Sequence, residues 1–182
     1  EALVWCPDSN FFLIGATARI DQLKKNTTIV FGTDSTLSAS WSIWEQLRIA
    51  RRTGLLTDEE LFQAVTATPA SLWKLRNTGT WEDGMQADLV VAKQKNKQVF
   101  NAFYGIDTED ILLVMKKGKI ILFDASLRDQ LIKQMNGMDA WHPVYIKNTC
   151  KYVTGQLPAL IDAIQQYAPG LILPVKTTPD QP

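Results

Sequence analysis

The fold is decided by the stretch Ile29-Val30-Phe31-Gly32-Thr33-Asp34-Ser35, a short β-branched apolar run that ends in a carboxylate. A strand of a parallel sheet is buried on both faces, so an acidic residue belongs at its end rather than inside it. Barrel enzymes collect their catalytic groups at the carboxyl ends of their strands. We therefore predict that residues 28–32 form a barrel strand that delivers Asp34 to an active site. Gly32 lets the backbone turn there or approach a ligand closely.

Asp34 also has a second interpretation, as a helix cap. Asp34 and Ser35 precede a helical segment, and short side chains that carry an oxygen accept hydrogen bonds from the first amides of a helix. On these residues alone capping is the more common role, and a catalytic or ligand role is the alternative.

Apolar spacing predicts helices on both sides of this strand. Residues 16–25 and 40–52 each carry apolar side chains on one helical face, and Gly54 is a suitable end for the second helix. A capping box at Thr57 opens a third helix, and a fourth is expected over residues 69–75, where proline suits the first turn.

The periodicity of the sequence changes in its second half. Residues 88–92 are strand-like, and residues 111–115 are expected to pair with residues 119–123 as a hairpin across Lys116-Lys117-Gly118.

The last segment, residues 125–182, is predicted to be mainly helical. Apolar spacing indicates one helix that ends at Asn136-Gly137 and another over residues 157–167. Trp141 and His142 are expected to contribute packing rather than chemistry, because aromatic groups carry a large apolar area.

Composition excludes several classes of partner. The 19 basic and 19 acidic residues balance, which disfavours binding to nucleic acid or to an anionic membrane. No apolar run reaches the roughly 18 residues of a transmembrane helix, and no signal peptide is visible, although one upstream of Glu1 is left open. Cys6 and Cys150 form no paired motif and are expected to be packed thiols, which together with these features suggests a cytoplasmic protein.

Further motifs flank the strand in a fixed order. Together they resemble the C-terminal part of the amidohydrolase superfamily, in the branch of cytosine and guanine deaminases and of chlorohydrolase-like triazine hydrolases. The similarity covers about residues 2–124. The motifs that carry it are Cys6-Pro7-Asp8-Ser9-Asn10, Gly32-Thr33-Asp34-Ser35-Thr36-Leu37-Ser38, Thr66-Ala67-Thr68-Pro69-Ala70-Ser71-Leu72 and Gly79-Thr80-Trp81-Glu82-Asp83-Gly84-Met85-Gln86-Ala87-Asp88-Leu89-Val90-Val91.

The resemblance implies a metal-dependent hydrolase that acts on carbon–nitrogen bonds, other than peptide bonds, of a small cyclic or amide substrate. Asp34 matches the aspartate that ligates or approaches the divalent metal, zinc or iron, and takes a proton from its bound water. Zinc lowers the pKa of bound water to about 7, and an adjacent carboxylate can then carry that proton to the leaving group.

The resemblance also suggests two substrate-binding residues. Ser38 matches a serine that lies near the substrate, where it would hydrogen-bond a ring nitrogen or a polar substituent; the alternative is a serine in the first turn of a helix that bonds the backbone. Asn10 belongs to the Ser-Asn pair of the first motif, and the usual role of asparagine in turns favours structural support as its alternative role.

The implied fold is α/β. Residues 1–78 would be the C-terminal part of a (β/α)8 TIM barrel, with its last two strands and helices. Residues 79–124 would supply strands of a small β-sandwich, and residues 125–182 a mainly helical extension.

The sequence departs from the family in its metal ligands. It has a single histidine, His142, whereas the family places a His-x-His pair on strand one and further histidines on strands four to six. A catalytic zinc site takes three protein ligands and a water, so Asp34 alone cannot make one. We therefore expect that Glu1 is not the natural start, that the missing N-terminal portion of the same protein completes the site, and that the fragment alone is inactive.

Two interpretations thus remain. In the first, the chain is part of an amidohydrolase-like enzyme that binds a small molecule, with a homo-oligomer left open. In the second, it is a noncatalytic structural or interaction domain that keeps Asp34 only as a helix cap.

Overall fold

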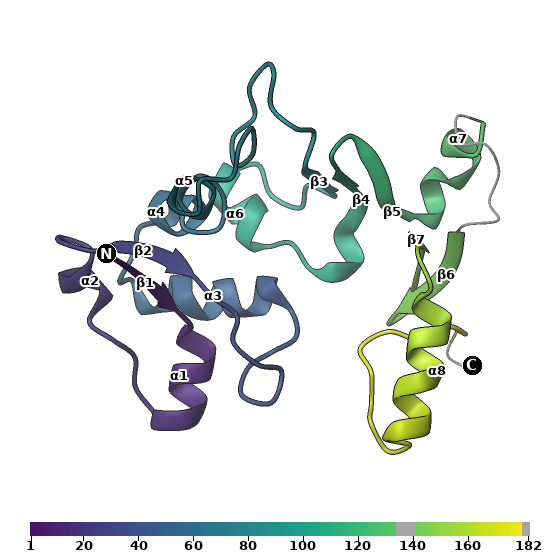
Figure 1. The fold of residues 1–182 in the computed structure, drawn as a ribbon, viewed down its shortest axis with the longest axis horizontal. Helices are drawn as coiled ribbons and strands as arrows, with labels where there is room; N and C mark the ends of the chain where they lie inside the picture. Colours follow the sequence, from purple (N-terminus) through teal and green to yellow (C-terminus); the bar gives the residue numbers. More distant parts are fainter. Residues whose placement is uncertain (134–140, 180–182) are drawn as a thin grey trace. The chain divides into compact units, whose positions relative to one another are not determined.

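The apolar run around Val30 forms a strand, as predicted. This strand, β2 (Thr28–Phe31), pairs in parallel with β1 (Ala2–Trp5), and Val4 lies opposite Val30 (Figure 1). The computed structural model describes residues 1–133 and 141–179. They divide into two units, of which the first comprises residues 1–86 and 94–107.

The helices of the first unit gather around this strand pair and bury its apolar side chains. Trp5 and Ile29 of the strands join a core with Ile20, Leu47 and Tyr104. The helices are α1 (Pro7–Ile14), α2 (Ile20–Leu23), α3 (Ile43–Thr53), α4 (Asp58–Gln63), α5 (Ala67–Leu72) and α6 (Val99–Tyr104).

The predicted helices are present, with shifted bounds. The helix expected over residues 16–25 is reduced to the single turn of α2, and that expected over residues 40–52 begins only at Ile43. The capping box at the start of α4 is confirmed, because the Thr57 hydroxyl accepts from the Glu60 amide at 3.1 Å and the Glu60 carboxylate accepts from the Thr57 amide at 2.8 Å.

Two helices, α1 and α6, were not predicted from the sequence. In α1 the apolar residues Phe11, Phe12, Leu13 and Ile14 are consecutive and exposed, so they show no helical periodicity. Both helices are short, and short helices depend on tertiary packing rather than on their own propensity.

Helix α6 is attached to α3 by two arginines. Arg48 donates to the carbonyl oxygens of Tyr104 and Ile106, at 3.2 and 2.8 Å, and Arg51 donates to Asn101 at 2.7 Å. The Tyr104 ring is buried beneath Arg51, whose guanidinium carbon lies 4.9 Å from the ring centroid. These contacts attach residues 94–107 to the rest of the first unit.

The second unit contains an antiparallel sheet with the strand order β3-β4-β5-β7-β6. The predicted hairpin is confirmed as β4 and β5, joined by Lys117 and Gly118, which both have positive φ, as a tight hairpin turn requires. The strands are β3 (Leu89–Ala92), β4 (Ile111–Lys116), β5 (Lys119–Asp124), β6 (Trp141–Ile146) and β7 (Thr149–Thr154).

The structure differs from the mainly helical extension expected over residues 125–182. Strands β6 and β7 lie in this segment and extend the sheet. Along β6, Val144 and Ile146 are buried and their neighbours are more exposed, which is the alternation expected for a strand that buries one face. Short helical turns do occur, and the expected C-terminal helix is confirmed. The helical elements of this segment are η2 (Ala125–Leu127), α7 (Arg128–Leu131) and α8 (Leu157–Tyr167). A further short turn, η1 (Thr108–Asp110), precedes β4.

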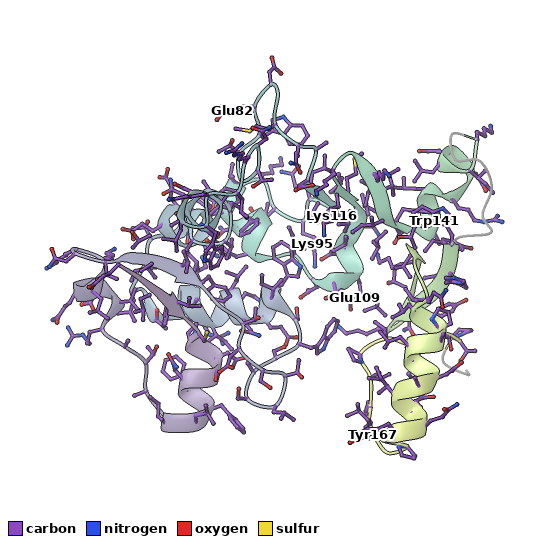
Figure 2. The ribbon with its side chains drawn as sticks, viewed as in Figure 1. Glu82, Lys95, Glu109, Lys116, Trp141 and Tyr167 are labelled. Carbon is purple, nitrogen blue, oxygen red and sulfur yellow. The ribbon has the colours of Figure 1, made fainter. Side chains whose placement is uncertain are left out.

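The expected helix end at Asn136-Gly137 lies outside the described residues. Tyr167, labelled in Figure 2, ends α8 with an exposed side chain. Over the described ranges, none of the helices combines the length and the apolar character needed to cross a membrane.

Lys151 is the most unusual residue of the sheet, because its side chain is fully buried on β7. Its ammonium donates to the carbonyl oxygens of Glu109 and Ile111, each at 2.7 Å, and to Asp124 Oδ2 at 2.8 Å. All three ammonium protons thus have acceptors, which is the condition for burying such a charge. The contact joins β7 to the start of β4 and the end of β5.

Candidate functional site

The candidate site lies at the carboxyl end of the β1–β2 pair. Because the strands are parallel, Cys6 after β1 and Asp34 after β2 are delivered to the same end (Figure 1). The pairing continues one residue beyond β2, where the Gly32 amide donates to the Trp5 carbonyl at 2.8 Å.

Gly32 is required here because the two chains approach closely. A Cβ at this position would lie 2.5 Å from Val4 Cγ1 and 2.6 Å from Cys6 Sγ, closer than real Cβ contacts come. The absence of a side chain therefore lets the two strand ends stay together, and with them the segments that carry Cys6 and Asp34.

Asp34 sits on an exposed turn and adopts a left-handed backbone conformation, with φ of 53°. Aspartate tolerates this conformation better than most residues. Its carboxylate oxygen Oδ2 accepts a hydrogen bond from the Ser9 hydroxyl at 2.5 Å. No hydrogen bond to Oδ1 is found within residues 1–133 and 141–179.

The interpretation of Asp34 as a helix cap is wrong. The next helix, α3, begins at Ile43 after Ser42, well beyond Asp34. The nearby amide of Leu37 donates to the Ser35 hydroxyl, at 3.1 Å, rather than to Asp34. The carboxylate instead accepts a hydrogen bond from Ser9 of α1.

Ser38 joins the same cluster through Ser9. The Ser9 hydroxyl oxygen lies 3.0 Å from that of Ser38, and the Ser38 hydroxyl also lies 3.3 Å from the Ser35 carbonyl. Ser38 belongs to the turn before α3 and not to a helix. The structure therefore brings two of the three predicted site residues, Asp34 and Ser38, onto one buried serine.

Asn10 makes a different contact. It lies in α1, and its Oδ1 accepts from the Thr17 hydroxyl at 3.1 Å, while Thr17 accepts from the Trp5 indole at 2.7 Å. This chain of hydrogen bonds fastens the segment between α1 and α2 to the core. The hydrogen bond of Asn10 is therefore of the kind that supports a loop.

The turn that carries Asp34 and Ser38 is held by residues that sequence reasoning did not single out. Asp8 accepts from the Ser40 amide at 2.7 Å, and the Ser40 hydroxyl donates to Glu45 at 2.5 Å. The buried Gln46 donates to the Ser40 carbonyl at 2.5 Å. Ser9 and Asp8 lie in the first recognised motif, which was the one sequence signal for them.

Cys6 is an ionisable residue that interacts with Asp34. Burial raises the pKa of the Cys6 thiol, and the negative charge of Asp34 raises it further, against a smaller opposing effect of the Asp34 backbone amide. These effects disfavour the thiolate, which is the form of cysteine that attacks substrates or binds metals.

The metal-binding capacity of this site is limited. Among the residues that the structure describes, no three His, Cys, Asp or Glu side chains are grouped to hold a metal ion. His142, the single histidine of the sequence, is on β6 in the second unit. The residues present therefore do not by themselves fit the three-ligand site of a catalytic zinc.

A surface hollow in the first unit lies away from this cluster. Its lining includes Thr28, the first residue of β2, together with Ala67, Thr68, Ser71 and Leu72. Thr28 is at the amino end of the strand, whereas Asp34 follows the carboxyl end. The hollow is therefore not part of the candidate site.

Comparison with known proteins identifies the family of the chain. Residues 2–121 match the sequence model of the Amidohydrolase family. The match contains β1, β2 and the whole Asp34 cluster, and it ends within β5. A comparison with curated proteins finds no match. Because the match covers well over half of the sequence, the chain belongs to the amidohydrolase family.

Proposed function

We propose that this chain contributes the aspartate side of the active site of a hydrolase that cleaves carbon–nitrogen bonds, other than peptide bonds, in a small cyclic or amide substrate. The observation that carries the proposal is the Asp34 carboxylate at the carboxyl end of β2. One of its oxygens is held by Ser9, and Oδ1 accepts no hydrogen bond from the described residues. The similarity to the branch of deaminases and chlorohydrolases supports this choice of substrate.

In this role Oδ1 of Asp34 takes a proton from the attacking water and gives it to the leaving nitrogen. A positioned carboxylate of this kind contributes about 100- to 10,000-fold to rate. Ser38, one hydrogen bond away from Ser9, would bond a ring nitrogen or polar substituent of the substrate. Asn10 Oδ1 is engaged by Thr17, so a substrate contact from Asn10 would come from its amide nitrogen.

The family resemblance further implies a divalent metal, zinc or iron, beside Asp34. The remaining ligands are proposed to come from a preceding portion of the same protein, and β1 and β2 would then be the last two strands of its (β/α)8 barrel. The exposure of Val4 on β1 is consistent with further strands beside this pair. Unpaired strand edges are normally covered by another part of a protein. The sheet of the second unit would belong to the β-sandwich.

Asp34→Asn tests the proposed role of the carboxylate. Asparagine tolerates the left-handed conformation and keeps the side-chain shape, so the fold should survive the change. The protein would be produced from its full reading frame and assayed for ammonia release from aminopyrimidines, aminopurines and aminotriazines, and for ring opening of simple cyclic amides. We expect kcat to fall by at least about 100-fold with an unchanged unfolding midpoint.

The matched control is Asp83→Asn, which removes an exposed carboxylate from a loop outside the cluster. This variant should turn over substrate like the unmodified protein. Unchanged turnover by Asp34→Asn, on any substrate that the unmodified protein hydrolyses, would refute the catalytic role.

A noncatalytic structural or interaction domain is the second candidate. It is favoured by the observation that the described residues hold no group of three potential metal ligands. If it is correct, elemental analysis of the protein from the full reading frame will show no stoichiometric metal, and no substrate in the panel will be hydrolysed. Stoichiometric zinc or iron that depends on Asp34 would exclude it.

A further inference from the structure

We propose that Ser9 is a positioning residue for Asp34. In this view its hydroxyl occupies Oδ2 and leaves Oδ1 as the single oxygen that faces the reacting groups. The consequence for catalysis rests on the function proposed above, whereas the fixed carboxylate is a property of this chain alone.

Ser9 is well placed to act as a fixed point. It lies in the first turn of α1, four residues after the end of β1, and its residue is 1% exposed. Asp34, by contrast, is on an exposed turn, where a side chain samples several rotamers unless another group holds it. The burial of Ser9 therefore gives the exposed carboxylate an anchor that solvent does not displace.

The direction of the hydrogen bonds follows from the proton count. The Ser9 hydroxyl has one proton and two oxygens within reach, Asp34 Oδ2 at 2.5 Å and Ser38 Oγ at 3.0 Å. A charged acceptor at the shorter distance takes that proton. The Ser9 oxygen can then accept from the Ser38 hydroxyl, whose single proton also has the Ser35 carbonyl oxygen within reach at 3.3 Å. When the Ser38 proton is directed to Ser9, the bonds run from Ser38 to Ser9 to Asp34.

This order couples the two predicted site residues. When Ser38 donates its proton to Ser9, the Ser9 oxygen becomes more negative and its proton a stronger donor to Asp34, because linked hydrogen bonds polarise one another. A substrate group that donates to the Ser38 oxygen strengthens the same chain, whereas one that accepts the Ser38 proton interrupts it. Ser9 thereby links substrate contact at Ser38 to the orientation of Asp34.

The first test reads the carboxylate directly in the protein produced from its full reading frame. The asymmetric carboxylate stretch of Asp34 would be assigned from the infrared difference between the unmodified chain and Asp34→Asn. In Ser9→Ala this band should move to higher frequency, because a hydrogen bond to one oxygen weakens that carbon–oxygen bond. Ser71→Ala is the matched control, since it removes the hydroxyl of an exposed serine on α5 that lines the separate hollow and not the Asp34 cluster.

The second test uses the protein from the full reading frame with its substrate. Ser9→Ala should lower kcat by roughly 10- to 100-fold with little change in KM, because it frees the carboxylate without removing a substrate contact. Ser38→Ala should instead act mainly on KM, and Ser71→Ala should leave both constants near their original values. A loss confined to KM in Ser9→Ala would overturn the positioning role.

The two tests separate the possible failures. An Asp34 band that stays in place in Ser9→Ala overturns the Ser9 inference whatever the enzyme does. A band that moves while Asp34→Asn retains full turnover leaves the anchored carboxylate established and refutes the proposed function.

Discussion

At the scale of single residues, the candidate site depends on three residue types, an aspartate, a glycine and a serine, each at a position that few other residues could occupy. Asp34 combines a carboxylate with tolerance of a left-handed backbone, and Gly32 supplies the absence of a side chain. Ser9 contributes a small hydroxyl that fits where it is almost fully buried. Each residue type therefore has a steric reason as well as a chemical one.

Gly32→Ala tests the steric requirement. The added methyl would meet Val4 Cγ1 and Cys6 Sγ at about the distances quoted above, so these side chains must rotate or β1 and β2 must separate at their carboxyl ends. We expect a loss of about 1–3 kcal/mol in the free energy of unfolding, measured by urea denaturation. Gly170→Ala is the control, because a Cβ there has no atom within 4 Å and its φ is not left-handed. Equal stability of the two variants would contradict the close approach.

At the scale of elements, α6 shows how an unpredicted helix is held. Its Tyr104 hydroxyl donates to the Asp58 carbonyl at 2.6 Å, and its ring packs edge-on against Phe103 at a centroid distance of 5.0 Å. Together with Arg48 and Arg51 of α3, these contacts replace the local signals that a six-residue helix lacks.

Tyr104→Phe tests the contribution of this docking. Loss of the hydrogen bond to the Asp58 carbonyl should cost about 1 kcal/mol of unfolding free energy at neutral pH. Burial raises the pKa of Tyr104 to about 12, helped by Asp58 and opposed by Arg51. Since the unfolded value is about 10, the folded state holds this proton longer, and its stabilising contribution is lost as the pH rises from about 10 through 12.

The Phe variant has no such titration, so its stability should fall less steeply over the same alkaline range. The measurement is urea denaturation at a series of pH values. Tyr167→Phe is the control, because Tyr167 is exposed and its replacement should leave the alkaline profile unchanged. Identical alkaline profiles for Tyr104→Phe and the unmodified chain would contradict the prediction.

At the scale of the whole molecule, the chain passes between its two units more than once. Residues 87–93 enter the second unit as β3, residues 94–107 return to the first unit, and the remainder completes the sheet. The family match stops at residue 121, whereas β6 and β7 lie beyond it in the same sheet. Lys151 of β7 is the buried residue that joins these later strands to the matched ones.

Lys151→Met tests this junction. The variant removes the donor to Asp124 Oδ2 and to two carbonyl oxygens, and we expect a loss of about 3–5 kcal/mol in unfolding free energy. Lys119→Met, at an exposed position on β5, is the control and should change stability by less than about 0.5 kcal/mol. Thermal and urea unfolding of the whole chain provide the measurement, and similar values for both variants would contradict the role of Lys151.

The pH dependence adds a second readout for Lys151→Met. Burial raises the pKa of Asp124, but hydrogen bonds from Lys151 and Ser126 outweigh this and hold it below its usual range. Asp124 therefore stabilises the fold above about pH 4, and this contribution is lost as the pH falls further. The difference in stability between the unmodified chain and the variant should accordingly shrink below about pH 4.

The sequence by itself determined the parts whose signals are local. The apolar run of β2, the hairpin of β4 and β5 and the capping box of α4 each depend on residues within a few positions of one another. The position of Asp34 after the end of β2 could likewise be predicted, because buried strands exclude charged residues from their interior.

Only the tertiary structure decided the rest. Ser9 meets Asp34 across 25 positions of sequence, and Lys151 meets Ile111 across 40, so no local pattern encodes either contact. The helical expectation for the segment of β6 and β7 failed for the same reason, since strand pairing is settled by partners elsewhere in the chain. Packing between distant segments selects such contacts, because their free energy appears only once those segments are brought together.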